Sequence, residues 1–447
     1  MILIAILFFC IAAYIIVDEH IALNNVVLKS ILSFYFTLTI LSFCYLFVLA
    51  LGINFTLFEI LFLLLPLAYL VVYFKKNNTF KLHFDTIKNE SFFVLLLVLI
   101  LLSVFSYHYF DAAIRWGEWD AWAIWTSHAK VLTSDTYFSN LFTDKISWTH
   151  PDYPLFLPAN IAIVWKSIGS HSAFVPAIFA YITSVALVLV ILTSFLEKKH
   201  AVIGLLLFLA LTYFDVLFPF VVWQYADTVF ALFVLLPFVL LQHLPKQQPY
   251  KILVLIGFFA AAAAWVKNEG IMFFGLFSLV FFIKYCRNFK LITHFILGAL
   301  LPLSVLFFFK IKFAPTNDLM DGSTNEYAEK LVDFENYKVI LNFAYTFIID
   351  NCKLLYMSLI AILILNYKYI YSFCFLVIFG LLVAYFFVYV TTPYDIMWHL
   401  STSLNRLLHQ VTPILLYSIF MAFAERLKTL YVALGVKRNK TRKVMRQ

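Results

Sequence analysis

The candidates for chemistry in this chain are acidic and basic side chains that gather in a few short segments of an otherwise apolar sequence. The first segment reads Arg-Trp-Gly-Glu-Trp-Asp-Ala-Trp and contains Glu118 and Asp120. A carboxylate in such a place would serve as a general base. Because the two acids are two positions apart, their side chains would point about 200° apart on a helix. We therefore expect at most one of them to face a shared cavity. The alternative interpretation is an interfacial helix with two solvated acids, in which Trp119, Trp122 and Trp125 lie flat at the membrane surface.

A second segment lies 30 residues further on and reads His150, Pro151, Asp152, Tyr153, Pro154, Leu155, Phe156, Leu157, Pro158. Its three prolines predict a rigid, extended strip instead of a regular helix. Such a strip would fix His150 or Asp152 against the membrane face. The alternative is a plain proline-rich connector.

Further ionisable residues stand at the ends of apolar runs: Asp227, Lys267, Glu269, His399 and Arg406. Ionisable groups at membrane depth are costly, and they are usually paired or functional. Arg406 is suited to a phosphate because a guanidinium presents several donors. A purely structural pair between Lys267 and Glu269 is an equally open interpretation.

The composition excludes a soluble protein. Of 447 residues, 64% are hydrophobic and only 13% charged, whereas soluble chains carry about 25% charged residues. The net charge of +8 does not indicate nucleic-acid binding, because eight of the 32 Lys and Arg residues lie in the basic tail 426–447. A basic tail after an apolar segment is typical of a cytoplasmic anchor attracted to anionic lipid.

No metal or disulfide pattern is evident. The five cysteines form no CxxC pair, and the histidines show no close HxH or HxxxH spacing. The sequence therefore requires no cofactor and leaves the metal ligands unknown, although a divalent cation held by carboxylates and a lipid phosphate stays open.

Apolar runs of spanning length predict an all-α polytopic membrane protein with about thirteen transmembrane helices. The runs lie at 1–17, 29–50, 56–74, 91–109, 172–196, 201–222, 226–243, 251–266, 270–285, 291–310, 350–366, 369–390 and 411–425. The first run has no charged n-region and no cleavage site, so we expect a retained helix instead of a signal peptide. We divide the chain into N-terminal helices (1–90), a catalytic membrane domain (91–425) and the tail (426–447).

The distribution of positive charge predicts the orientation. Alternate connections, together with the tail, carry 21 of the 32 Lys and Arg residues, which places them in the cytoplasm, with the N-terminus outside and the C-terminus inside. The long loops 108–171 and 311–349 are then external, and all nine tryptophans lie in or beside outer connections. The charged stretch 318–338 reads as a solvated segment or a short interfacial helix. The presence of all nine tryptophans on one side of the membrane indicates a site on the outer face.

Carboxylates, cations and aromatic rings on one membrane face suit a reaction between a lipid-borne anionic donor and a polar acceptor. The chain resembles the GT-C superfamily of integral-membrane glycosyltransferases in its early acidic motif (118–120), in the proline motif that closes the same loop (150–154), and in the phrases WDAWAIW, HPDYP, KNEG and NRLLHQVTP. The phrases are particularly similar to bacterial members akin to dolichyl-phosphate-mannose protein mannosyltransferases. The resemblance covers roughly residues 91–425.

The resemblance implies a GT-C-like bundle in a bacterial inner membrane, with interfacial helices in a long catalytic outer loop. The donor would be a polyprenyl-phosphate-linked sugar, and the acceptor a glycan, lipid or protein. Asp120 would be the base, Glu118 its alternate, and Asp152 a second acid that orients the acceptor or a metal. The donor-binding residues would be Lys267 and Arg406, and the further substrate-binding candidates are His150, Glu269, His399, Trp119, Trp122 and Tyr153.

Other classes stay in consideration. A surface-polysaccharide polymerase or ligase would share the lipid-linked donor and the outer-face chemistry. A lipid-linked sugar flippase or transporter needs polar groups near the midplane of its helices, and this chain has few. A purely structural subunit is disfavoured by the cluster of tryptophans and acids.

Overall fold

The computed structural model describes residues 1–20, 25–77, 92–197, 206, 222–245, 249–317 and 323–444. It is all-helical, with 85% of the residues in helices and no strand among the residues described. The first four helices are α1 (Ile2–His20), α2 (Val26–Leu51), α3 (Phe55–Lys76) and α4 (Phe92–Ala112). Asn25 and Asn54 begin α2 and α3 by accepting hydrogen bonds from first-turn amides, of Leu28 in α2 and of Thr56 and Leu57 in α3.

The long segment after α4 folds into short helices before the chain returns to the bundle. These are a π-helix η1 (Ala121–Thr126), α5 (Ser127–Leu132), η2 (Phe138–Phe142), η3 (Asp144–Thr149) and α6 (Phe156–Ile168). Five longer helices follow: α7 (Phe174–Glu197), α10 (Ala226–Gln242), α11 (Tyr250–Val266), α12 (Glu269–Tyr285) and α13 (Phe289–Lys312).

The C-terminal part consists of α14 (Thr324–Val332), α15 (Phe334–Phe347), η5 (Ile348–Cys352), α16 (Lys353–Leu365), η6 (Tyr367–Tyr371), α17 (Phe373–Val390) and α18 (Ile396–Val444). The second long loop expected, 311–349, thus contains α14 and α15. A capping box at Ser323 starts α14, which fits the short helix foreseen within 318–338.

Among the described residues, seven helices are long and apolar enough to cross a membrane, or eight if the bent pair formed by α15 and α16 counts as one span. They support a multi-pass membrane protein. The helices α10 and α11, the segment Val98–Ala112 and α6 are apolar but shorter. The span expected at 201–222 lies almost entirely outside the described residues, so the count of thirteen stays a prediction.

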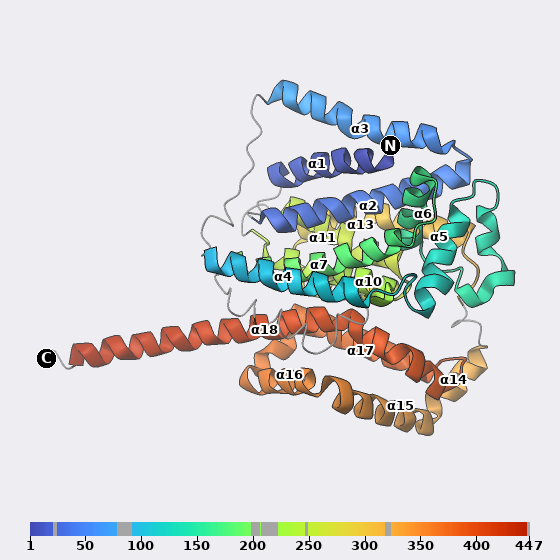
Figure 1. Cartoon of the computed structure of the whole chain (residues 1–447). Coiled ribbons are helices and arrows are strands. Elements are labelled where there is room, and N and C mark those ends of the chain that lie inside the picture. Colours follow the sequence, from blue (N-terminus) through green and yellow to red (C-terminus); the bar gives the residue numbers. More distant parts are fainter. Residues whose placement is uncertain are drawn as a thin grey trace.

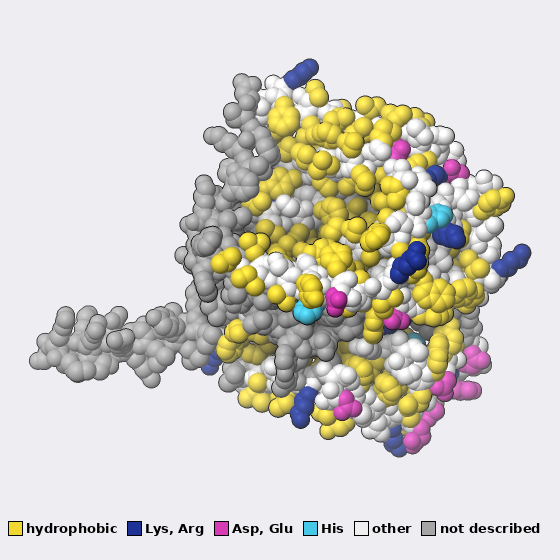
Figure 2. All heavy atoms as spheres, in the orientation of Figure 1, with side chains coloured by type: hydrophobic (Ala, Val, Ile, Leu, Met, Phe, Trp, Pro, Cys, Tyr) yellow, Lys and Arg dark blue, Asp and Glu magenta, His cyan; other side chains and the backbone are white. Residues whose placement is uncertain are grey.

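The long helices run roughly side by side, and α11 and α13 lie between the layer of α1–α3 and that of α15–α18 (Figure 1). The short helices after α4 and the helix α14 gather at one end of this bundle. Hydrophobic side chains cover much of the face in Figure 2, whereas acidic side chains cluster near the end that carries α14. The bundle therefore has one end that carries the short helices and a cluster of acidic side chains, called the polar end below.

Two glycines let α11 and α13 approach until their backbones touch. A Cβ atom added to Gly257 would lie 1.9 Å from the Phe295 carbonyl oxygen, and one added to Gly298 would lie 1.9 Å from that of Val254. Small residues at a membrane helix crossing permit this close packing. The crossing fixes α11 and α13, which both end at the polar end of the bundle.

Two local expectations are corrected by the helix boundaries. The extended strip expected at 150–158 is wrong: His150 is left-handed, and a turn closed by the Tyr153 N–H on the His150 carbonyl at 3.0 Å follows it. Pro158 lies in the first turn of α6, where a missing N–H costs nothing. The final span was expected at 411–425, but α18 begins at Ile396, which places His399 and Arg406 inside the candidate span Ile396–Arg426. Residues 396–410 contain no glycine or proline that would end the helix.

Candidate active site

A tight turn positions Asp120 just ahead of η1. Gly117 has φ +72°, and a Cβ atom there would lie 2.4 Å from the Trp223 carbonyl oxygen. The next amide, of Glu118, donates a 3.1 Å hydrogen bond to that same oxygen. Gln224 is also left-handed, with φ 61°, and its side chain donates to the Ile114 carbonyl at 2.6 Å. The acidic motif is thus fastened to the turn that precedes α10.

Of the two acids in this motif, Asp120 is buried and Glu118 is exposed, in line with their spacing. The Arg406 guanidinium of α18 lies 2.6 Å from the Asp120 carboxylate. The same nitrogen, Nη2, is 3.7 Å from Asp227 of α10, and the guanidinium stacks over the Tyr225 ring at 5.1 Å. Arg406 therefore connects the first loop, α10 and α18.

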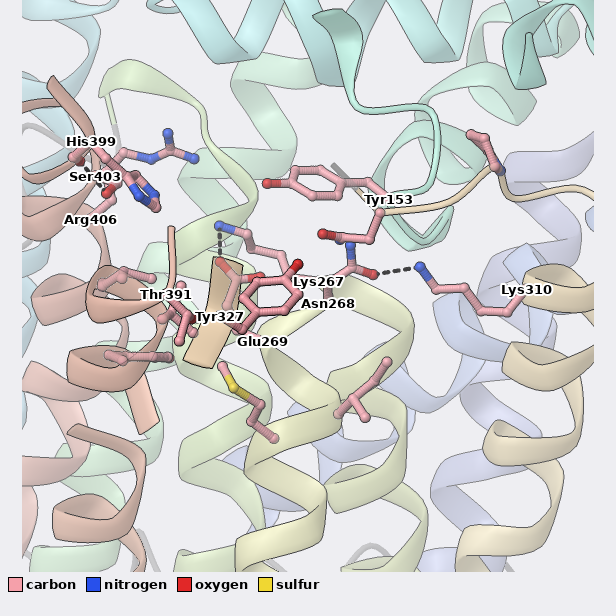
Figure 3. Close-up of a pocket in the computed structure, with 17 residues that line it drawn as sticks. Tyr153, Lys267, Asn268, Glu269, Lys310, Tyr327, Thr391, His399, Ser403 and Arg406 are labelled. Carbon is pink, nitrogen blue, oxygen red and sulfur yellow. Dashed lines mark hydrogen bonds and ion pairs between the residues drawn. The ribbon is translucent and has the colours of Figure 1, made fainter. Parts of the chain in front are cut away.

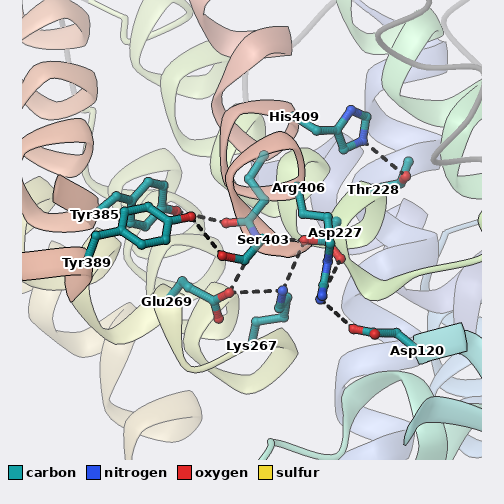
Figure 4. A network of polar contacts seen from close by, with 11 residues as sticks. Asp120, Asp227, Thr228, Lys267, Glu269, Tyr385, Tyr389, Ser403, Arg406 and His409 are labelled. Atoms are coloured by element: carbon teal, nitrogen blue, oxygen red, sulfur yellow. Dashed lines mark hydrogen bonds and ion pairs between the residues drawn. The ribbon is translucent and has the colours of Figure 1, made fainter. Parts of the chain in front are cut away.

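A second network surrounds Lys267, which lies in the turn between α11 and α12 (Figure 4). Its ammonium is 3.0 Å from Asp227 and 2.9 Å from Glu269. The Gln410 amide donates to Asp227 at 2.6 Å and to Glu269 at 3.4 Å, and Tyr385 donates to the Gln410 oxygen at 2.8 Å. Burial alone lowers the pKa of Lys267, but the two carboxylates outweigh it and raise that pKa above its ordinary value. Lys267 is therefore a buried cation.

The third group is centred on Asp152, which is buried near the start of the proline segment 150–158. Asn268 and Asn317 donate to its Oδ2 at 2.7 and 2.8 Å, and the Lys310 ammonium lies 3.6 Å from that oxygen. Lys310 also donates to the Asp152 carbonyl at 2.6 Å and to the Asn268 side chain at 2.8 Å. The proline segment is thereby held against the ends of α11 and α13.

These groups surround a cavity of about 680 Å³ at the polar end of the bundle (Figure 3). The volume lies within the range of small-molecule sites. Three cations, Lys267, Lys310 and Arg406, and one carboxylate, Glu269, line it. The other lining residues are Tyr153, Asn268, Ile271, Met272, Pro315, Asn317, Tyr327, Tyr385, Val388, Thr391, His399, Ser403 and Leu407.

Two residues that line this cavity each keep one buried polar atom without a hydrogen-bond partner among the described residues. One is the Nε donor of Arg406, and the other is the Oε2 acceptor of Glu269. Buried polar groups are nearly always satisfied, so an orphan needs a reason. An anionic ligand would suit the unused donor, and a hydroxyl group would suit the unused acceptor.

Tyr153 forms one wall of the cavity and stands in a stack of rings. The Trp125 and His150 rings both stack on it, nearly parallel, with centroid distances of 5.5 and 5.1 Å. Burial, together with the nearby carboxylate of Glu269, raises the pKa of Tyr153 well above its ordinary value. Its hydroxyl group is therefore protonated and available as a donor.

The tryptophan motif divides between inside and outside. Trp125 is fully buried, so the expectation that it lies flat at the membrane surface is wrong, because the π-helix η1 turns it toward Tyr153. Trp119 and Trp122 are about half exposed, in contact with each other and, through Trp119, with Trp148. None of these three lines the cavity.

The sequence-predicted residues therefore fall into three groups. Tyr153, Lys267, Glu269, His399 and Arg406 line the cavity; Asp120, Asp152 and His150 contact its lining residues; Glu118, Trp119 and Trp122 lie outside it. His399 is held by the Thr392 hydroxyl, with 2.8 Å between its Nδ1 and that oxygen.

Sequence reasoning missed Gln410, Lys310, Asn268 and Asn317 as site residues. A signal existed for Gln410 and Lys310, which are polar residues within or at the end of apolar runs.

The described residues contain no group of three or more His, Cys, Asp or Glu side chains arranged to hold a metal ion. The carboxylates Asp120, Asp152 and Glu269 are each paired with a cation or an amide. Comparison of the chain with protein-family models, with curated proteins and with solved structures finds no match.

Proposed function

We propose that this protein is an integral-membrane glycosyltransferase of the GT-C type, which moves a sugar from a polyprenyl-phosphate-linked donor to an acceptor hydroxyl. In this proposal the bundle has about thirteen membrane helices. The protein lies in a bacterial inner membrane with its N-terminus outside and its basic tail in the cytoplasm, so the cavity opens on the outer face.

The observation that carries the proposal is the pairing of cations and carboxylates around one cavity. Lys267, Lys310 and Arg406 supply positive charge, and Arg406 retains an unused donor. A lipid phosphate is the anion that a site at the end of a membrane bundle meets. Tyr327 and Tyr385 add aromatic rings to the lining, and aromatic rings of this kind pack against the apolar faces of sugars.

The proposed reaction is a single displacement that inverts the anomeric carbon. An acceptor hydroxyl gives its proton to a carboxylate, and its oxygen forms a bond to that carbon while the bond to the phosphate oxygen breaks. Polyprenyl phosphate departs with the electron pair. It needs cations that stabilise its charge, and no strong acid. Asp120 is the proposed base, and Glu269 is the alternative because it lines the cavity with an unused acceptor.

Transfer of label from a panel of polyprenyl-phosphate sugars in proteoliposomes tests the proposal. Wild type should transfer from at least one donor. Asp120→Asn should lower the rate about 10²-fold or more, as removal of a general base does. Glu118→Gln is the matched control, since Glu118 is exposed in the same motif, and it should stay within about twofold of wild type.

The remaining outcomes discriminate between alternatives. Full activity of Asp120→Asn with collapse of Glu269→Gln moves the base to Glu269. Transfer that occurs only to a polymer, with repeated units added, assigns a polysaccharide polymerase or ligase. Absence of transfer from every donor, combined with movement of the labelled lipid across the bilayer, refutes the enzyme and indicates a flippase.

A further inference from the structure

A second hollow lies at the opposite end of the same helices that form the candidate active site. Its volume is about 550 Å³. The helices α10, α12 and α18 reach the active site with Asp227, Glu269 and Arg406, and they reach the hollow with Gln242, Lys284 and Ser418. Its full lining is Phe238, Leu241, Gln242, Lys284, Tyr285, Asn366, Lys368, Tyr369, Ser372, Phe373, Cys374, Ser418, Met421, Ala422 and Glu425.

The length of α17 places this hollow near the surface of the membrane. The helix begins at Phe373, in the hollow, and ends at Val390, beside the cavity residues Val388 and Thr391. Its 18 residues rise about 27 Å, close to the thickness of the hydrocarbon core. The hollow is therefore at the level of the lipid headgroups on the face opposite the active site.

Positive charge is concentrated at this hollow. Lys284 and Lys368 line it against one carboxylate, Glu425. The Lys284 ammonium is held 5.6 Å from the centres of the Phe373 and Tyr285 rings, so it is positioned toward the hollow. The first turn of α17 adds its partial positive charge, because Ser372, Phe373 and Cys374 all line the hollow.

A buried hydroxyl also lacks a proper partner there. Tyr369 is 8% exposed and lines the hollow. Its hydroxyl lies near those of Ser372 and Ser418, yet it makes no hydrogen bond of normal geometry. A phosphate oxygen would accept a hydrogen bond from it, which removes the cost of an unsatisfied buried group.

Apolar side chains continue from the hollow onto the lipid-facing surface. Ile283 precedes Lys284 and is 67% exposed, and Ile364 and Tyr371, which flank the segment of Lys368, are 76% and 77% exposed. A lipid whose anionic headgroup is bound at the two lysines can thus lay its acyl chains along these exposed apolar residues.

We propose that this hollow binds the phosphate-bearing headgroup of a membrane phospholipid, with Lys284 and Lys368 as its cationic contacts. The lipid phosphate lies against the first turn of α17 and the Tyr369 hydroxyl, and its acyl chains follow the exposed apolar residues. The site lies at the far ends of the helices from the catalytic cavity and does not depend on the proposed transferase activity.

Native mass spectrometry of the full-length protein, purified in detergent and titrated with phosphatidylglycerol, tests this site. Lys284→Ala/Lys368→Ala should weaken lipid retention on the order of 10-fold or more, since each basic residue near a lipid surface contributes appreciably. The matched control is Arg287→Ala/Lys290→Ala, which removes two exposed cations that do not line the hollow. It should change retention by less than about twofold. The variant Lys284→Arg/Lys368→Arg should restore binding, which excludes misfolding as the cause.

Two results would overturn the assignment. Equal losses of lipid retention in Lys284→Ala/Lys368→Ala and in its control would mean that the lipid is attracted to positive charge in general and not to this hollow. Binding of inorganic phosphate in the absence of lipid, or displacement of the lipid by millimolar phosphate, would assign the hollow to a soluble phosphate.

Discussion

The guanidinium of Arg406 and the carboxylate of Asp120 form an ion pair at 2.6 Å that joins the last long helix to the first long loop. The pair is partly shielded from water, with 18% and 11% of the two side chains exposed. A guanidinium reaches two acceptors at once, and here the second is Asp227, at 3.7 Å. A lysine offers only a single compact charge in this place.

Arg406→Lys should therefore lower the transfer rate even though it keeps the charge. We expect a loss of about 10²-fold in kcat/KM, because a compact ammonium lacks the planar fork whose separate nitrogens can hold Asp120 and contact a leaving phosphate. Arg406→Ala should be worse. Steady-state transfer in proteoliposomes measures both, and Arg406→Lys with wild-type kinetics would contradict the bridging role.

Lys267→Met should destabilise the protein by about 3–5 kcal/mol, because it leaves the carboxylate of Asp227 buried without its closest cation. The double variant Lys267→Met/Asp227→Asn should recover part of this loss. Lys338→Met is the control, since its pair with Glu335 is 66% and 75% exposed, and should cost less than about 1 kcal/mol. Unfolding in detergent micelles measures all three, and equal losses for the two single variants would refute the prediction.

His128 should make the protein sensitive to acid. It is buried, with its Nε2 atom 3.1 Å from the Thr149 hydroxyl, and burial lowers its pKa to about 3. Because the unfolded chain binds this proton near pH 6.5, the contribution of His128 is fully present above that pH. It is lost progressively as the pH falls from about 6.5 toward 3, by up to about 1.4 kcal/mol per pH unit.

His128→Gln should flatten this acid dependence of the unfolding free energy. His171→Gln is the control because His171 is exposed, and it should keep the wild-type slope. Unfolding curves between pH 4 and pH 8 give the comparison. A slope that persists in His128→Gln would show that another group is responsible.

Gly257→Ala should loosen the crossing of α11 and α13, since its Cβ would lie 1.9 Å from a backbone carbonyl that cannot move aside freely. Overpacking of this kind costs about 1–3 kcal/mol or more. Gly275→Ala in α12 is a matched control with nothing within 4 Å, and alanine there should be neutral or stabilise the helix by up to about 1 kcal/mol. Thermal unfolding distinguishes the two, and equal midpoints would contradict the close packing.

The sequence was informative about which segments are apolar and which polar residues stand at their ends. Lys267, Glu269 and Arg406 were expected at a shared site and all line one cavity. The pairing of Asp120 with Arg406 could not be read from the chain, because nothing local sets a distance between residues so far apart. The same holds for Lys310 and Asn317, whose contacts with Asp152 depend on how α13 packs.

Helix boundaries were the weaker part of the sequence analysis. The polar residues 399–406 suggested a connection, but Ser401, Thr402 and Ser403 donate to carbonyls of the preceding turn, so a helix that begins at Ile396 accommodates them. The buried position of Trp125 was equally hidden, because the spacing of three residues does not distinguish a surface helix from one whose register is shifted by a π-turn.

The position of α18 in the chain has a consequence for biosynthesis. Asp227 meets Lys267 after 40 further residues have been made, but it meets Gln410 only after 183. Asp120 must likewise wait for Arg406. A nascent chain therefore inserts its early acids well before their later partners emerge from the ribosome. The arrival of α18 is the step at which Asp120 gains its cation, Asp227 gains a second one, and the cavity gains its last wall.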